Sequence, residues 1–300
     1  MRKFIIQLFV FSISFFVVEK AFYFFLSIPP RLERDRRLEY VLNGKINKDL
    51  IVLGSSRGSR NIIASQIEDS LNISCYNLSY DGSDIEFHEF LLRSLIKHNK
   101  KPKIVLLAVD DPSELLPDES IKFRFDRLYP LVKFNYINNE LIEKGENTFL
   151  SNFLILARIN KRNFSIGEKK FSELDSIMKC GSMPISFQRK DRRFVFFNNS
   201  NYKVDNELPE KVKAFRDLQN LCVNNNIQLI TVYSPNFKEH NILFKKRIKE
   251  ISHPKVTSIL YDSTNQIYKN KDYFYDEAHL KRNGAVIFTN EIIRQLKAML

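Results

Sequence analysis

The chain has 300 residues, of which 44% are hydrophobic and 27% charged, a balance that suits a globular protein with a sizeable core and argues against intrinsic disorder. Its three cysteines, Cys75, Cys180 and Cys222, are odd in number and far apart, which excludes a disulfide framework and a zinc site built on thiolates. The net charge of +12 favours an acidic partner such as anionic lipid, anionic glycan or nucleic acid.

The N-terminus, residues 1–30, is predicted to be a membrane anchor. Residues 4–18 and 21–28 are almost entirely apolar, and Pro29 and Pro30 then stop the helix. Because about 20 apolar residues cross a bilayer, this stretch is long enough to do so. A cleaved signal peptide and a buried globular helix are the alternatives, although no convincing small-x-small cleavage site follows the first run.

Basic residues on both sides leave the orientation of the anchor open. One group precedes it and the other follows: Arg2 and Lys3, and Arg31, Arg34, Arg36 and Arg37. The positive-inside rule counts both groups, so charge does not decide the topology. The same arginines are suited to lipid headgroups on either side.

Residues 31–300 are predicted to form an α/β domain, a three-layer α/β/α sandwich around a parallel five-stranded sheet. Short apolar runs alternate with longer helical patterns, and apolar residues on both faces of a strand are typical of a parallel sheet covered by helices. We expect the flavodoxin-like strand order 2-1-3-4-5, with functional residues at the carboxyl ends of the strands. The predicted strands are Leu50–Leu53, Ile73–Leu78, Ile104–Val109, Gln228–Tyr233 and Ser258–Tyr261, and the predicted helices are Ile85–Lys97, Pro209–Asn225, Lys238–Ile251 and Ala285–Leu300.

The alternation stops between Pro112 and Leu208, which is predicted to be a mostly helical insertion, residues 112–208. It holds aromatic and basic clusters, FRFDRLYPLVKFNY at 123–136 and QRKDRRFVFF at 188–197. A cap packed on the sheet is one interpretation. A substrate-facing lid that supplies basic groups is the other, because long insertions in compact domains are often functional.

The first predicted strand runs into a turn of small residues, Gly54-Ser55-Ser56-Arg57-Gly58. A serine on such a turn has a raised hydroxyl beside free backbone N–H groups, which suits a nucleophile. The spacing excludes a phosphate loop, and the missing third glycine excludes a dinucleotide fingerprint. A plain turn with serine as helix cap remains the structural alternative. Arg57 and Arg60 are candidates to bind an anionic group, or to form local salt bridges.

A second constellation lies near the C-terminus, where Asp276 and His279 are three residues apart. At this spacing the carboxylate can reach the imidazole and orient it, as a serine nucleophile requires. A capping aspartate beside a surface histidine is the alternative, and two residues without a third ligand do not make a zinc site. No metal or other cofactor is expected. The remaining histidines are interpreted as surface or capping residues: His88, His98, His240 and His253.

Together these two segments resemble the SGNH/GDSL hydrolase superfamily, over residues 48–111 and 227–300. The resemblance implies a catalytic triad of Ser56, Asp276 and His279. It also implies an oxyanion hole formed by the N–H groups of Ser56 and Gly82. At the third strand the family commonly has G-x-N-D, whereas this chain reads Val109-Asp110-Asp111. An ionised aspartate would repel an oxyanion, so another donor replaces the asparagine or hydrolysis is weakened.

Within this superfamily, the chain is most similar to the membrane-attached branch that includes proteins for O-acylation of cell-envelope polymers. The similarity lies in the G-S-S-R turn, the altered sequence after the third strand and the N-terminal anchor. The resemblance implies a membrane-anchored serine esterase or O-acyltransferase, with an extracytoplasmic catalytic domain, an envelope glycan or polymer as substrate and a membrane-bound acyl-donor partner. The alternative is a catalytically weak or inactive binding or assembly protein in polysaccharide biosynthesis. Nucleic acid is not expected as a partner, because the basic charge lacks a reading motif.

Overall fold

The protein is described from a computed structural model that covers residues 1–300 except 110, 169–171, 188–193, 195–201, 238–240 and 300. Five strands form one sheet, in which all pairs are parallel and the order is β2-β1-β3-β4-β5. The predicted fold class and strand order are therefore confirmed. The strands are β1 (Leu50–Gly54), β2 (Cys75–Asn77), β3 (Ile104–Ala108), β4 (Gln228–Tyr233) and β5 (Thr257–Leu260).

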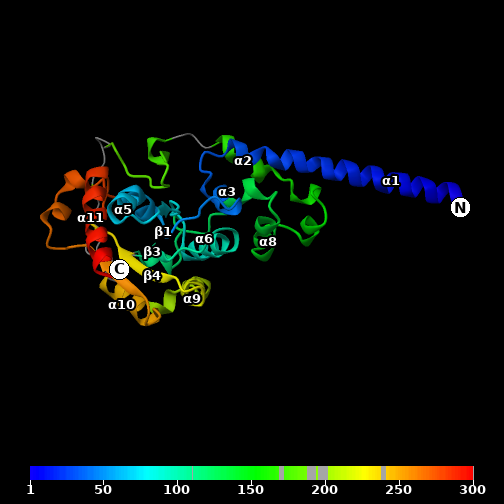
Figure 1. Ribbon diagram of the computed structural model, residues 1–300. Helices are drawn as coiled ribbons and strands as arrows, with labels where there is room; N and C mark the ends of the chain where they lie inside the picture. Colours follow the sequence, from blue (N-terminus) through cyan, green and yellow to red (C-terminus); the bar gives the residue numbers. More distant parts are fainter. Residues whose placement is uncertain (110, 169–171, 188–193, 195–201, 238–240, 300) are drawn as a thin grey trace. The chain divides into compact units, whose positions relative to one another are not determined.

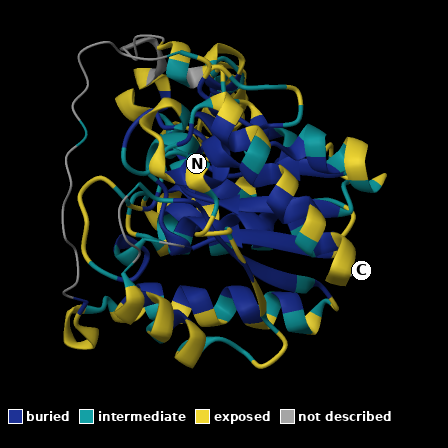
Figure 2. Ribbon diagram, turned by 90° about the vertical axis from the view of Figure 1, so that its left-hand side faces the viewer, coloured by how far each residue is buried: buried dark blue, intermediate teal, exposed yellow. Residues whose placement is uncertain are grey.

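The sheet is covered by helices on both faces (Figure 1). Side chains that alternate along the strands, such as Leu50 and Val52, pack with Ile67 of α5 and Phe288 of α11, while α6 and α9 pack against each other on the opposite face. Figure 2 shows the strands almost wholly buried and the exposed residues on the outer sides of the helices. These helices are α4 (Ser56–Asn61), α5 (Ala64–Leu71), α6 (Ile85–His98), α9 (Pro209–Asn224), α10 (Ile242–Ile251) and α11 (Arg282–Met299).

The described part of residues 112–208 adds no strand to the sheet, and its regular elements are helices, as predicted. It contains α7 (Phe125–Leu128), α8 (Asn135–Glu143) and the 3-10 helices η2 (Pro112–Glu114), η3 (Tyr129–Leu131), η4 (Phe149–Asn152), η5 (Leu156–Arg158), η6 (Lys161–Glu168), η7 (Glu173–Asp175) and η8 (Val204–Asn206). Two further 3-10 turns precede α11, η9 (Gln266–Lys269) and η10 (Lys271–Tyr273).

The chain forms two compact units. Unit 1 comprises Met1–Glu39 and Arg124–Phe171, and unit 2 comprises Tyr40–Phe123 and Ser172–Leu300. The sheet lies in unit 2, so the anchor boundary predicted at residue 30 falls inside unit 1. The N-terminal elements are α1 (Arg2–Ala21), η1 (Phe22–Ser27), α2 (Pro29–Leu32) and α3 (Arg37–Leu42). The expectation that Pro29 and Pro30 stop the helix is wrong, because they occupy the first turn of α2, where proline is tolerated. The continuous helical stretch Arg2–Leu32 is long and apolar enough to be a membrane anchor or a signal sequence.

Candidate active site

The end of β1 places Ser56 at the start of a short helix. Gly54, the last residue of β1, has a φ of +148°, and a Cβ there would lie 2.8 Å from the Ala108 Cβ on β3. The backbone of Ser55 is extended, and α4 begins at Ser56. Ser55 occupies the N-cap position, but its side chain makes no capping hydrogen bond. The turn therefore leaves both hydroxyls available at the carboxyl end of the strand.

The loop before α11 is folded around the side chain of Asp276. Its Oδ1 accepts hydrogen bonds from the backbone N–H groups of Ala278 and His279, at 2.9 and 2.8 Å. The N–H of Tyr275 donates to the carbonyl of His279 at 2.8 Å. A tight turn of this kind fixes the direction of the imidazole before any substrate is bound.

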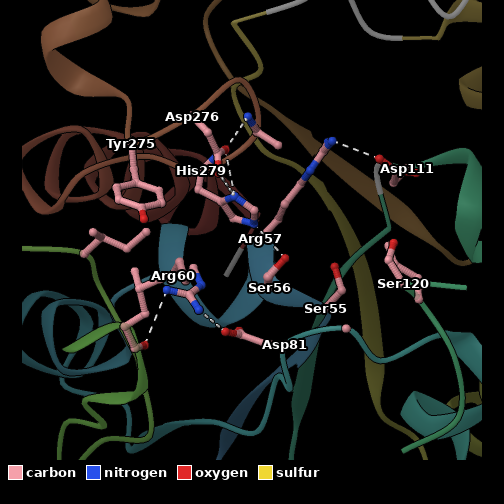
Figure 3. Close-up of a pocket in the computed structure, with 15 residues that line it drawn as sticks. Ser55, Ser56, Arg57, Arg60, Asp81, Asp111, Ser120, Tyr275, Asp276 and His279 are labelled. Carbon is pink, nitrogen blue, oxygen red and sulfur yellow. Dashed lines mark hydrogen bonds and ion pairs between the residues drawn. The ribbon is translucent and has the colours of Figure 1, made fainter. Parts of the chain in front are cut away.

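The structure brings Ser56, His279 and Asp276 together (Figure 3). His279 Nε2 lies 2.7 Å from Ser56 Oγ, and His279 Nδ1 lies 2.8 and 2.9 Å from the two carboxylate oxygens of Asp276. A proton on Nδ1, donated to Asp276, leaves the Nε2 lone pair facing the serine hydroxyl. This is the geometry in which a histidine can take a proton from a nucleophile.

Asp276 is suited to hold that tautomer. Burial by itself raises the pKa of the Asp276 carboxyl, but hydrogen bonds from His279 and the nearby backbone N–H groups lower this pKa well below its ordinary value. The carboxylate is therefore ionised at neutral pH and can stabilise an imidazolium that forms when the serine is deprotonated.

Asn61 connects helix α4 to the loop that holds His279. Its side-chain oxygen accepts from the N–H of Leu280 at 2.9 Å, and its amide donates to the carbonyl of Ala278 at 3.3 Å. Asn61 is fully buried at the end of α4. No sequence pattern indicates this residue, because a lone asparagine carries no signal of a partner more than two hundred positions away.

Gly82 lines the same pocket as Ser56, on a turn after β2. Its φ of +67° is one that glycine adopts without strain. As the first residue of α4, Ser56 has an N–H without an intrahelical acceptor, the usual condition of the first turn. The two expected oxyanion donors therefore border one cavity.

The Gly82 turn is braced by a buried histidine. Ser83 Oγ lies 2.6 Å from the carbonyl of Tyr80 and 2.9 Å from His88 Nε2. Since the hydroxyl proton is used at Tyr80, the Nε2–H of His88 donates to Ser83. Burial, aided by the charge of Lys211, lowers the pKa of His88 to about 3. The interpretation of His88 as a surface or capping residue is wrong: α6 turns this side chain into the core, where it is 0% exposed.

Both predicted anion-binding arginines line the pocket, and each is paired with a carboxylate. Arg57 Nη2 lies 3.0 Å from Asp111 Oδ2, and Arg60 forms an ion pair with Asp81. Asp111, expected to repel an oxyanion, also accepts from the N–H and hydroxyl of Ser113 at 3.0 and 2.6 Å. Its charge is thus offset within the site. Asp110, the other residue at this departure from the family pattern, lies outside the described residues.

The turn between β1 and α4, the Gly82 turn and the loop before α11 all contribute side chains or backbone to a cavity of about 390 Å³. The insertion lines part of this cavity with uncharged side chains. Its described residues therefore bring no basic group to the pocket. The basic cluster at 188–193, considered for a lid, lies outside the described residues. Lining residues that no sequence motif indicates are Asp81, Ser120, Ile121, Leu174, Ile185, Tyr275 and Ala278.

No protein-family model matches this chain, and no curated protein matches it. Among the described residues, no group of three or more His, Cys, Asp and Glu side chains could hold a metal ion.

Proposed function

We propose that the protein is a membrane-anchored serine esterase or O-acyltransferase of the SGNH type. The observation that carries the proposal is the continuous hydrogen-bonded chain from Ser56 Oγ through His279 to Asp276, at the edge of a cavity. The helix Arg2–Leu32 supports the anchor, and by the resemblance of the motifs the substrate is an acyl ester of an envelope glycan or polymer.

In the proposed reaction Ser56 Oγ attacks the ester carbonyl carbon while His279 Nε2 takes the hydroxyl proton. The carbonyl oxygen becomes an oxyanion beside the N–H groups of Ser56 and Gly82. His279 then gives its proton to the leaving alcohol, and the acyl group stays on Ser56. Water or a sugar hydroxyl, activated by the same imidazole, attacks the acyl-serine and releases the enzyme. The acceptor decides between hydrolysis and transfer.

A fluorophosphonate probe tests whether Ser56 is an activated nucleophile. Full-length protein in detergent should be labelled, and Ser56→Ala and His279→Ala should lose the label. Ser55→Ala is the matched control, because it removes the neighbouring hydroxyl of the same pocket and should keep the label. Label that survives in Ser56→Ala and disappears in Ser55→Ala would move the nucleophile to Ser55.

The second candidate function is an assembly or binding protein that keeps the arrangement of the triad without turnover. It is favoured by one feature, the Asp110-Asp111 pair at the place where the family carries an oxyanion-binding asparagine. Absence of label in a well-folded wild-type sample would support this second function. So would full biological activity of Ser56→Ala.

A further inference from the structure

A cluster of exposed apolar side chains lies on η4, the turn that follows it and the start of η5, in unit 1. Phe149, Leu150 and Phe153 are 66%, 60% and 63% exposed, and Leu156 is 37% exposed. The rings of Phe149 and Phe153 meet edge to face, with centroids 5.4 Å apart. We call these four residues the apolar ridge. Contiguous exposed apolar surface of this kind marks a site of protein or membrane contact.

A buried carboxylate joins the apolar ridge to helix α1. Glu19 accepts a hydrogen bond from the backbone N–H of Ile155 and is 2% exposed, whereas its neighbours in the first 18 residues are all exposed. Lys20 Nζ lies 2.9 Å from Glu19 Oε2. Because Ile155 sits between Phe153 and Leu156 in the chain, the ridge lies beside α1 at the level of Glu19; Figure 1 shows this green segment close to the blue helix.

The apolar part of α1 before Glu19 is short for a bilayer. Residues 4–18 rise about 1.5 Å each and cover about 22 Å, whereas the hydrocarbon core is about 30 Å thick. A membrane that accommodates this helix therefore extends past Glu19 and reaches η1, where Tyr23, Phe24 and Phe25 are 47%, 68% and 48% exposed. The apolar ridge lies at the depth that this extension covers.

Polar groups near the ridge have partners inside the protein, which a lipid environment demands. The N–H groups of Ser151 and Phe153 donate to the carbonyls of Thr148 and Leu150, at 3.0 Å each. Arg158 is 4% exposed, and its Nε donates to the carbonyl of Ser151 at 2.7 Å. The irregular backbone of this segment can therefore lie in the membrane without relying on water for these bonds.

We propose that the apolar ridge is a second membrane-contacting element, which inserts into the bilayer that α1 crosses, at the depth of Glu19. The inference rests on the proposed membrane anchoring of α1 and goes beyond it. A single helix leaves the attached unit free to rotate and tilt against the bilayer. A second, laterally displaced contact restricts that motion and holds unit 1 in one orientation at the membrane surface.

The absence of tryptophan from the sequence makes the depth of the ridge directly measurable. Phe153→Trp places one fluorophore on the ridge, and Phe149→Trp is a second, independent probe. Phe11→Trp reports insertion of α1. Leu243→Trp, on α10 of unit 2, is the matched control, because Leu243 is 50% exposed and apolar but lies outside the ridge. Each full-length variant is reconstituted into phosphatidylcholine vesicles whose acyl chains carry bromine, which quenches tryptophan on contact.

We expect strong quenching of Phe153→Trp, Phe149→Trp and Phe11→Trp. The fluorescence of Leu243→Trp should be the same as in bromine-free vesicles. Quenching of Phe11→Trp alone would overturn the ridge contact and leave the anchor intact. No quenching of Phe11→Trp would overturn the anchor, and the ridge proposal with it. Quenching of all four variants would show adsorption of the whole surface and would also overturn the proposal. Circular dichroism of each variant establishes that it is folded.

Discussion

At the scale of single residues, the contacts of Asp276 set the orientation of the His279 imidazole. The carboxylate holds the Nδ1 proton and also accepts two backbone N–H groups of its own loop. An amide at this position can offer only one oxygen, and its NH₂ group would favour the wrong imidazole tautomer. The carboxylate therefore positions the proton as well as the ring.

We expect Asp276→Asn to slow covalent labelling of Ser56 by about 10³- to 10⁴-fold, the size of effect that loss of the correct tautomer has in serine proteases. The rate of fluorophosphonate labelling, at neutral pH, is the measurement. Glu291→Gln is the matched control, because Glu291 is also a buried carboxylate that accepts hydrogen bonds, from Asp262 N and Asn265. Equal rates in Asp276→Asn and wild type would contradict the orienting role.

His88 should make the free energy of unfolding depend on pH. The native pKa of His88 is lowered to about 3, whereas an unfolded histidine titrates at about 6.5. Between these two pKa values the unfolded state binds a proton that native His88 does not, so protonation favours unfolding. The stabilisation from the neutral histidine is therefore fully present well above pH 6.5 and decreases as the pH falls. From pH 7.5 to pH 5 the loss attributable to His88 is about 2 kcal/mol.

His88→Gln tests this dependence, because glutamine keeps an N–H donor for Ser83 and does not titrate. Over the same pH interval the variant should lose about 2 kcal/mol less unfolding free energy than wild type. Denaturant unfolding in detergent at the two pH values supplies the comparison. Parallel losses in both proteins would show that the histidine is not held neutral in the native state.

At the scale of elements, the close approach of β1 and β3 controls where α4 begins. Gly54 combines a φ of +148° with a Cβ position only 2.8 Å from the Ala108 Cβ. The other end of α4 is also fixed, since the Asn77 amide donates to the carbonyls of Gly58 and Ile62 at 2.8 and 3.0 Å. The six-residue helix is thereby held at both ends by the sheet edge.

Gly54→Ala should destabilise the protein by about 3 kcal/mol, from backbone strain together with the clash against Ala108. It should also reduce labelling of Ser56, because relief of the clash displaces the turn. Gly145→Ala separates the two causes: Gly145 has a φ of +74° and no atom within 4 Å of its Cβ position, so only the strain of about 1 kcal/mol remains. The thermal unfolding midpoints of the two variants measure these effects. Equal shifts of the midpoint in Gly54→Ala and Gly145→Ala would contradict an additional clash at Gly54.

At the scale of the whole chain, the burial of the N-terminal segment changes at Glu19. Residues before it are exposed along their length, as a lipid-facing helix requires. Residues after it contribute to the interior of unit 1, where Leu26 is 0% exposed and Pro29 and Pro30 are buried. Removal of the segment should therefore have different consequences on the two sides of Glu19.

A chain without residues 1–17 should keep unit 1 folded, whereas a chain without residues 1–30 should lose the buried Leu26 and with it about 2–5 kcal/mol. Limited proteolysis in the same mild detergent measures the difference through cleavage within residues 124–168. Rapid cleavage is expected only in the shorter chain. The same cleavage rate in both chains would contradict the contribution of Leu26, Pro29 and Pro30 to the interior of unit 1.

Local sequence patterns were enough to predict the sheet and the close contact of Ser56, Asp276 and His279. Apolar residues on both faces of runs such as Leu50–Leu53 predict buried parallel strands, because that pattern is local and has few other stable solutions. The spacing of Asp276 and His279 is equally local. It predicted their contact, and the turn before α4 indicated Ser56 as the candidate nucleophile. The short helices α4 and α5 were not predicted, since six to eight residues give little periodicity.

The polar side chains that connect distant elements of the site, and α1 with Ile155, were apparent only from their contacts in the folded protein. Asn61 bonds to the loop around Leu280, His88 supports the Gly82 turn, and Glu19 is buried against Ile155. In each case a buried polar group requires a hydrogen-bond partner, and the partner comes from another element that the fold brings near. Sequence spacing carries no record of such pairs, because periodicity and turn propensity are set by neighbours along the chain and these bonds by neighbours in space.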